Sequence, residues 1–400
     1  MPCYPGPRKA CKRASPRLGY MSIYLDHAAT TPMVDAAIAA MTAQMAQLGN
    51  PSSLHAPGRA SRKAIEQARE SLALHIGCVP SEIIFTASGT EANNTALKGL
   101  YWKGKSVGRN VIVISAIEHH AILDPAQWLA EHEGAEIVSI GVTSNGVLDF
   151  SQLEQLLKDR ADEIAVISVM HSNNETGALQ PITEIVALAS AHSIPVHSDA
   201  VQSFKKVPLS FSTLGLTALS LSAHKIGGPL GIGILVLKRG LEIPALLHGG
   251  GQEREIRSGT LNAPAIVGCA AAADGEYPGE HVREMRNLLA QGIVHVIPDA
   301  YINGASETLP GIVNATFPGT ESDTLLLLLD AQGIAASTGS ACSAGVQRPS
   351  HVLLAMGHSD KSARSSLRFS LGSTTSTSDV TSVLNALPGV IERARAANLR

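Results

Sequence analysis

The residues best suited to chemistry in this chain surround Lys225, which stands between a buried strand and a glycine turn. The strand is expected over Thr217–Leu221, and a second apolar run, Gly231–Leu237, follows the turn. Ser222 and His224 lie beside the lysine. Burial lowers the pKa of a lysine and makes its amine a usable nucleophile. A lysine that reaches water from a strand end would fit the same pattern, so the remaining residues must decide between these interpretations.

Polar side chains also follow four other strands that the sequence predicts. These strands are expected over Ile83–Thr86, Val111–Ser115, Ile164–Met170 and Ile194–His197. The groups that follow them are, in order, Ser88-Gly89-Thr90, Glu118-His119-His120, His171-Ser172-Asn173-Asn174 and Asp199-Ala200-Val201-Gln202. Ligands in an open parallel sheet bind at the carboxyl ends of the strands. The sequence therefore predicts that these groups share one polar pocket with Lys225.

Gly89 and Thr90 are suited to hold an anion. Small residues at the start of a helix expose backbone N–H groups, although ordinary helix capping gives the same pattern. The chain has no GxxxxGK[ST] motif, so this segment is not a nucleotide-binding P-loop.

Three histidines, His119, His197 and His224, could instead suggest a metal site. No HExxH or similar fixed spacing supports it, and the cation of Lys225 would repel a metal ion. We therefore expect no resident metal.

The same residues fit pyridoxal 5'-phosphate. This cofactor needs a lysine for a Schiff base, an acid that keeps the pyridine nitrogen protonated, a phosphate cradle and a flat partner for its ring. The candidates are, in that order, Lys225; Asp199; Gly89, Thr90, Ser222 and His224; and His119. We expect pyridoxal phosphate as the cofactor.

The elements that must position these residues form an α/β pattern. Apolar strands alternate with helical segments, which indicates a mainly parallel sheet flanked by helices. Seven strands are expected, the remaining two over Glu136–Ile140 and Ile232–Leu237. Pro32 is expected at the first position of a helix that runs to about Leu48.

The chain is expected to form two domains after a leader. Residues 35–278 would form the large cofactor-binding domain, and residues 21–34 and 279–400 a smaller α+β domain. Residues 1–20 are basic and proline-rich without an acid, which favours a disordered leader. Met21 as the true start and an organellar transit peptide are the alternatives.

Composition excludes several classes of protein. A hydrophobic content of 44% with 16% charged residues is typical of a globular enzyme, and a net charge of −3 suggests neither nucleic acid nor an anionic membrane as partner. The longest apolar run, Leu325–Leu329, is too short to cross a bilayer. Five scattered cysteines favour reduced thiols in the cytoplasm over a disulfide framework.

The motifs of residues 23–372 resemble those of the cysteine desulfurases, which are pyridoxal phosphate enzymes of fold type I and aminotransferase class V. They are YLDHAATTP at 24–32, GNPSS at 49–53, HSNNETG at 171–177, HSDAVQ at 197–202, SAHKIGGP at 222–229, HGGGQERE-IRSGT at 248–260 and SSLRFSLG at 365–372. The resemblance implies a role for each matching residue. Lys225 would carry the Schiff base, Asp199 would pair with the pyridine nitrogen, and Gln202 would bond the ring hydroxyl.

Other roles follow from the same resemblance. His119 would stack on the ring and move protons, while Gly89, Thr90, Ser222 and His224 would hold the phosphate. Asn174 and Arg368 would fix the carboxylate of the substrate. Thr260 would reach the phosphate of a neighbouring subunit, so a homodimer is implied.

Cys342 is the expected sulfur-accepting residue. Ser, Gly and Ala dominate the segment Ser337–Gly345, which favours an exposed, easily moved loop with a reactive thiol over a buried cysteine. The amino-acid sequence of this segment resembles that of the group I (NifS/IscS type) desulfurases. Cys78 and Cys269 sit in apolar helical patterns and are expected in the core.

The resemblance implies an L-cysteine desulfurase, which forms alanine and a persulfide on Cys342. The sulfur would pass to an acceptor or scaffold protein for iron–sulfur cluster assembly or tRNA thiolation, and Cys342 could ligate a transferred cluster. A selenocysteine lyase or another enzyme of the same family is the alternative, and a non-catalytic sulfur carrier is a more distant one.

Overall fold

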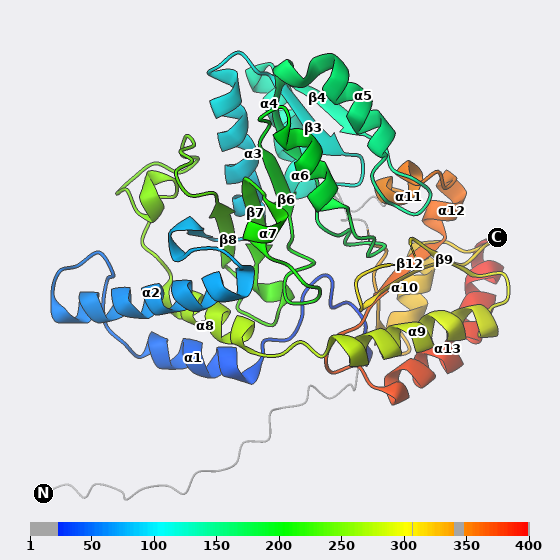
Figure 1. The fold of residues 1–400 in the computed structure, drawn as a ribbon. Coiled ribbons are helices and arrows are strands. Elements are labelled where there is room, and N and C mark those ends of the chain that lie inside the picture. Colours follow the sequence, from blue (N-terminus) through cyan, green and yellow to red (C-terminus); the bar gives the residue numbers. More distant parts are fainter. Residues whose placement is uncertain (1–22, 306, 340–347, 399–400) are drawn as a thin grey trace, which may run out of the picture.

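The computed structural model describes residues 23–305, 307–339 and 348–398. Its centre is a seven-stranded sheet in the order β2-β8-β7-β6-β5-β3-β4 (Figure 1). The strands are β2 (Ile83–Thr86), β3 (Val111–Ser115), β4 (Glu136–Ile140), β5 (Ile164–Ser168), β6 (Val196–Asp199), β7 (Ala218–Ser222) and β8 (Gly233–Leu237). Strand β8 runs antiparallel to both of its neighbours, and the other neighbouring pairs are parallel. The predicted mainly parallel sheet is confirmed.

Two hydrophobic cores form because successive strand residues point to opposite faces of the sheet. Ile84 packs with helices α3 (Gly89–Lys105) and α4 (His120–Glu133) on one face. Its neighbours Ile83 and Phe85 belong to the core on the other face. That second core contains helices α2 (Ala56–Ile76), α5 (Phe150–Arg160), α6 (Ile182–Ser190), α7 (Phe211–Leu214) and α8 (Ala263–Asp274). Because helices cover both faces of the sheet, a ligand is expected to bind at the ends of the strands.

The first helix begins later than predicted. Helix α1 spans Asp35–Met45 and packs against α8, so the expectation that Pro32 opens it is wrong. The backbone N–H of Val34 donates to the carbonyl oxygen of Gly227 at 2.9 Å, and Val34 is extended. This bond ties residues 32–34 to the glycine turn after Lys225, which delays the helix.

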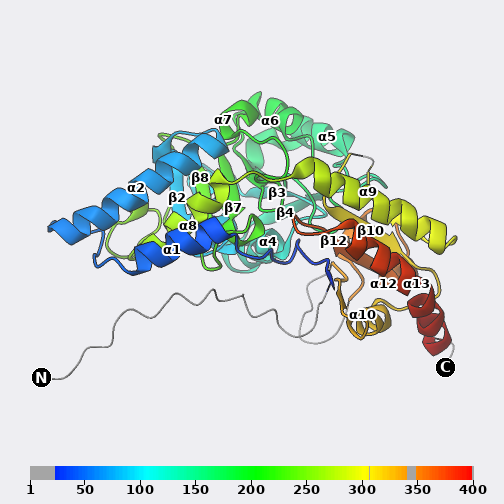
Figure 2. The same ribbon diagram turned by 90° about the horizontal axis from the view of Figure 1, so that it is seen from below.

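A smaller antiparallel sheet lies at one end of the molecule, to the right in Figure 1. Its order is β12 (Ser366–Ser370), β10 (Ile312–Thr316), β9 (Tyr301–Asn303). The helices around it are α9 (Gly279–Val296), α10 (Ser322–Asp330), α11 (His351–Ala355), α12 (Asp360–Arg364) and α13 (Thr377–Asn398). Figure 2 shows α9 and α13 side by side, and both contribute to one core.

The beginning of the described chain joins this smaller part. Strand β1 (Ile23–Tyr24) pairs in parallel with β11 (Ile334–Ala335), and Leu25 is buried in the core of α9 and α13. The domain boundaries at 34/35 and 278/279 stay a prediction. No helix within the described ranges is long and apolar enough to cross a membrane.

The segment that follows β1 crosses from the small sheet to the large one. The backbone N–H of Ala28 donates to Ser370 Oγ at 2.8 Å, and that of Thr31 donates to the carbonyl oxygen of His224 at 3.2 Å. Residues 26–31 therefore lie over the end of β7, beside Lys225.

Candidate active site

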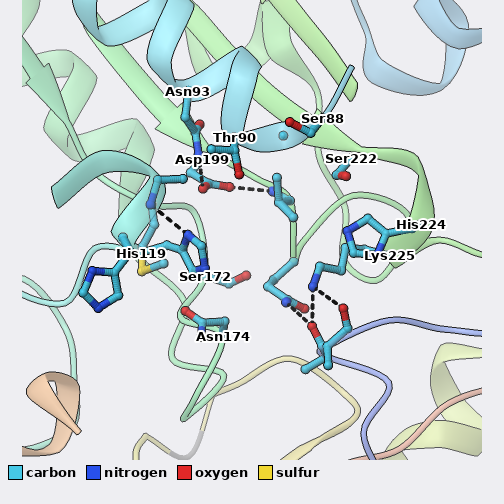
Figure 3. Close-up of a pocket in the computed structure, with 18 of the residues that line it drawn as sticks. Ser88, Thr90, Asn93, His119, Ser172, Asn174, Asp199, Ser222, His224 and Lys225 are labelled. Carbon is cyan, nitrogen blue, oxygen red and sulfur yellow. Dashed lines mark hydrogen bonds between the residues drawn. The ribbon is translucent and has the colours of Figure 1, made fainter. Parts of the chain in front are cut away.

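One cavity of about 400 Å³ opens at the carboxyl ends of β5, β6 and β7. Most of the residues singled out from the sequence line it: Gly89, Thr90, His119, Asn174, Asp199, Gln202, Ser222, His224, Lys225 and Arg368. Figure 3 shows many of these side chains converging on it. Thr260 does not line it and is exposed in the segment before α8, and Cys342 lies outside the described residues.

Lys225 occupies the end of a single helical turn, Ala223–Lys225, that directly follows β7. Its Nζ donates to the carbonyl oxygens of Ala28 at 2.6 Å and Ala29 at 2.7 Å (Figure 3). Burial, and then the charge of Arg368, lower the pKa of this amine to about 8. Lys225 is half-buried and lines the cavity, which favours a role in the site over a lysine that reaches bulk water.

Asp199 ends β6, and its carboxylate is held in place by two donors. Asn93 Nδ2 donates to Oδ2 at 2.6 Å, and the backbone N–H of Val201 donates to Oδ1 at 2.9 Å. Asn93 belongs to α3 and also lines the cavity, and the sequence analysis missed it. Its spacing of four residues from Gly89 places both on one helix face and could have revealed it.

The first turn of α3 forms one wall of the cavity. Ser88 caps the helix and accepts the backbone N–H of Glu91 at 3.1 Å. The N–H groups of Gly89 and Thr90 have no partners within the helix, because they belong to its first turn. A Cβ at residue 89 would lie 2.8 Å from Val201 Cγ2 and 3.2 Å from Ser222 Cβ, so only glycine fits there. This turn, with Ser222 and His224, is suited to a phosphate group.

His119 caps α4, and its ring borders the cavity. Nδ1 accepts the backbone N–H of Ala121 at 3.0 Å, so the proton of the neutral ring belongs on Nε2. Burial in the surrounding protein lowers the pKa of the ring, despite the opposing charge of Asp199. A neutral, planar ring with one N–H is therefore available at neutral pH.

Arg368 reaches the cavity from β12 of the small sheet. Its Nη1 donates to the carbonyl oxygen of Asn174 at 2.9 Å, and its Nη2 pairs with Asp26 Oδ1 at 2.8 Å. The two outer nitrogens of the fork are thus already engaged by protein groups. A substrate carboxylate would share this guanidinium with Asp26, so the role given to Arg368 and Asn174 stays a prediction.

Glu175 also lines the cavity and was not singled out from the sequence. Ser350 Oγ donates to Glu175 Oε2 at 2.5 Å, and the carboxyl group is fully buried, which raises its pKa. The acidic residue of the HSNNETG motif at 171–177 is the sequence feature that could have identified Glu175 as a candidate. Ser350 is the N-cap of α11, so its bond to Glu175 ties the start of this helix to the cavity wall.

The histidines that suggested a metal do not share one site. His197 is fully buried inside the sheet, where its ring nitrogens lie 2.9 Å from Ser168 Oγ and 2.9 Å from Ser220 Oγ. The ring therefore provides hydrogen-bond partners for these two buried hydroxyl groups. Within the described part of the chain, no group of three or more His, Cys, Asp or Glu side chains is arranged around a metal position.

Two ion pairs hold the glycine-rich segment at 248–260 against the large sheet. Arg69 Nη2 lies 2.7 Å from Glu253 Oε1, and Arg257 Nε lies 2.7 Å from Glu91 Oε1. Because Glu91 is in the first turn of α3, the second pair joins this segment to the wall of the cavity that α3 forms.

The donor set of the cavity fits pyridoxal phosphate. It combines a lysine amine, an oriented carboxylate, a flat imidazole and a helix start that only glycine can form. An α/β sheet that presents these groups at its strand ends defines a pyridoxal phosphate enzyme of fold type I.

Comparison with known proteins leads to the same class. The family model described as aminotransferase class-V matches residues 23–383. An IscS-like cysteine desulfurase of Mycobacterium tuberculosis is 48% identical over 385 residues, 94% of this chain and 98% of that protein. The cysteine desulfurase IscS of Dictyoglomus turgidum is 41% identical over 380 residues, 93% of this chain and 95% of that protein.

A solved structure of a NifS-like protein is 33% identical with a TM-score of 0.84, and the match covers 93% of this chain and 99% of that one. The chain belongs to the aminotransferase class-V family and, within it, to the cysteine desulfurases of the IscS and NifS type. The predicted family and its cofactor, pyridoxal phosphate, are thereby confirmed.

Proposed function

We propose that this protein is an L-cysteine desulfurase, which converts L-cysteine to L-alanine and passes the sulfur to an acceptor as a persulfide on Cys342. One observation carries the proposal. The amine of Lys225, with a pKa lowered to about 8, lies in the same cavity as Asp199 and the start of α3. These are the groups that a cysteine-cleaving pyridoxal phosphate enzyme needs at its centre.

Bound in the cavity, pyridoxal phosphate supplies an electron sink for charge that develops at the α-carbon of an amino acid. Lys225 Nζ would hold its aldehyde carbon, and Asp199 would keep its ring nitrogen protonated by charge pairing. The N–H groups of Gly89 and Thr90, with Ser222 and His224, would hold its phosphate. Gln202 would bond its ring hydroxyl, and His119 would stack on its ring.

The protein groups then move protons and sulfur. Lys225 Nζ would remove the α-proton of cysteine and later return a proton. Cys342 attacks the substrate sulfur as a thiolate, an S–S bond forms, and the C–S bond of the substrate breaks. The bonding electrons stay on the substrate carbon, which is protonated to give alanine. The sum is cysteine plus Cys342 thiol giving alanine plus Cys342 persulfide.

The proposed partners are a second copy of the chain and a protein that accepts the sulfur. A second copy of the chain would bring Thr260, which is exposed here, toward the phosphate site. The acceptor of the sulfur is proposed to be a scaffold for iron–sulfur clusters or a tRNA-thiolation protein, with Cys342 able to ligate a transferred cluster. We further place the enzyme in the cytoplasm, where the free thiols of Cys78 and Cys269 would stay reduced.

The test measures alanine and sulfide formed from L-cysteine with a reductant present, for the native protein and Cys342→Ala. Equal amounts of both products from the native protein, and almost none from the variant, are expected. Equal rates from both proteins would contradict sulfur transfer through Cys342 and favour a lyase such as a selenocysteine lyase, which does not need that thiol.

A further inference from the structure

A second lysine is connected to Lys225 through a short chain of hydrogen bonds. Lys206 lies four residues after Gln202 in the turns that follow β6, and its Nζ donates to Gln202 Oε1 at 3.2 Å. Gln202 Nε2 donates to the carbonyl oxygen of Ala28 at 2.8 Å. The same oxygen accepts from Lys225 Nζ at 2.6 Å. Gln202 therefore stands between the two lysines.

The bond from Lys206 decides which end of the Gln202 amide faces the cavity. Lys206 Nζ donates to Gln202 Oε1, so the amide oxygen points toward Lys206. The amide nitrogen is then left to point toward Ala28 and the cavity that Gln202 lines. Without Lys206, the amide could turn over and present an acceptor instead.

Lys206 itself does not line the cofactor cavity. It borders a neighbouring cavity of about 170 Å³, and Lys225 forms part of the wall of both. The titratable and charged groups around it are His27, Lys205, His224, Lys225, Glu276, Tyr277 and Arg368. Burial, and then the charges of Lys225 and Arg368, lower the pKa of Lys206 to about 7.

We propose that Lys206 is a positioning residue that fixes the Gln202 amide, so that the cavity offers an N–H donor to the ring hydroxyl oxygen of pyridoxal phosphate. The inference rests on the cofactor site described above and deepens it. This donor favours the deprotonated form of that oxygen. It therefore opposes the uptake of a further proton by the cofactor when it is joined to Lys225.

The experiment is a pH titration of the visible absorbance of the holoenzyme. Lys206→Met, which removes the donor and the charge with little loss of volume, should raise the midpoint of the titration by about one pH unit. Lys206→Arg, which keeps both, should stay close to the native midpoint. Lys205→Met is the matched control, because Lys205 lies toward Asp274 instead. Its midpoint should equal the native one.

A second measurement separates positioning from folding. The dissociation constant of pyridoxal phosphate from the apoprotein, followed by fluorescence, should rise about fivefold in Lys206→Met, which corresponds to the loss of one hydrogen bond. A Lys206→Met protein with native thermal stability and an unchanged midpoint would overturn the proposal. So would an equal midpoint shift in Lys206→Arg. Failure of the native protein to form alanine would contradict the proposed function alone, since the midpoint shift does not depend on turnover.

Discussion

Asn93 Nδ2 lies 2.6 Å from Asp199 Oδ2, and this bond joins helix α3 to the end of strand β6. The other polar atom of the amide, Oδ1, is buried with no hydrogen-bond partner among the described residues. The bond to Asp199 is therefore what orients the Asn93 side chain. It connects the start of α3, which is the proposed phosphate site, with the carboxylate that we propose pairs with the pyridine nitrogen of the cofactor.

Replacing Asn93 should weaken the cofactor site. In Asn93→Ala the Asp199 carboxylate loses a buried donor, so the dissociation constant of pyridoxal phosphate should rise about tenfold. Cofactor titration of the apoprotein measures this. Asn94→Ala is the control, because Asn94 is the next residue and bonds the carbonyl oxygen of Thr90 on an exposed part of the helix. Equal dissociation constants for the two variants would show that the bond to Asp199 has no part in binding.

The lowered pKa of Lys225 should be visible in the rate of cofactor binding. Only the neutral amine attacks an aldehyde, and the pKa of about 8 makes roughly one tenth of it neutral at pH 7. The rate at which apoprotein joins pyridoxal phosphate should therefore rise about tenfold per pH unit below 8 and level off above it. Stopped-flow absorbance gives this profile. A rate that still rises tenfold between pH 9 and about 10 would mean an ordinary, solvated lysine.

The ion pair between Arg69 and Glu253 should be important for stability. Both side chains are buried, and Glu253 also accepts the backbone N–H of Phe85 at 2.7 Å. Glu253→Gln leaves the buried guanidinium with only the half-exposed Glu66 as a counter-charge and should lower the free energy of unfolding by about 3 kcal/mol. Urea-induced unfolding of the holoenzyme measures this change. The control is Glu255→Gln, at an exposed neighbouring residue, which should unfold like the native protein. Equal losses of unfolding free energy in both variants would contradict the prediction.

His197 should make the fold sensitive to acid. Burial lowers its pKa to about 3, against about 6.5 in an unfolded chain. Below pH 6.5 the unfolded chain binds a proton that the folded chain does not, so stability is lost as the pH falls toward 3. The difference in unfolding free energy between the native protein and His197→Gln should therefore shrink by about 1.4 kcal/mol per pH unit below 6.5.

The matched variant for His197 is His192→Gln, because His192 is exposed. Its unfolding free energy should follow the native protein at every pH. If the difference between the native protein and His197→Gln were independent of pH, the ring would titrate as freely in the folded state as in the unfolded one.

The sequence was sufficient to predict the sheet and the edge where the site lies. Apolar runs such as Val111–Ser115 carry a strong local signal, and the polar groups after them collect at one edge because parallel strands share a direction. The start of α1 could not be predicted, because the bond between Val34 and Gly227 joins residues far apart in the chain.

Contacts of the same long-range kind explain why the partners of the predicted residues were missed. The pairing of Arg368 with Asp26 spans 342 positions and has no local pattern. Lys206 follows a motif that the sequence analysis quoted, but nothing in its spacing indicates that it bonds Gln202 rather than water. Asn93 was within reach of sequence reasoning, since helical spacing from Gly89 places it on the cavity side.

The most direct test of the account is a single turnover with L-cysteine in the absence of reductant, followed by mass spectrometry of the peptides. Sulfur transfer through Cys342 should give about one alanine per chain and one added sulfur atom on the peptide that contains Cys342. Cys78 and Cys269 should stay unmodified, because burial raises the pKa of each thiol to about 12. Alanine formed with the added sulfur on another cysteine, or with free sulfide and no added sulfur, would contradict it.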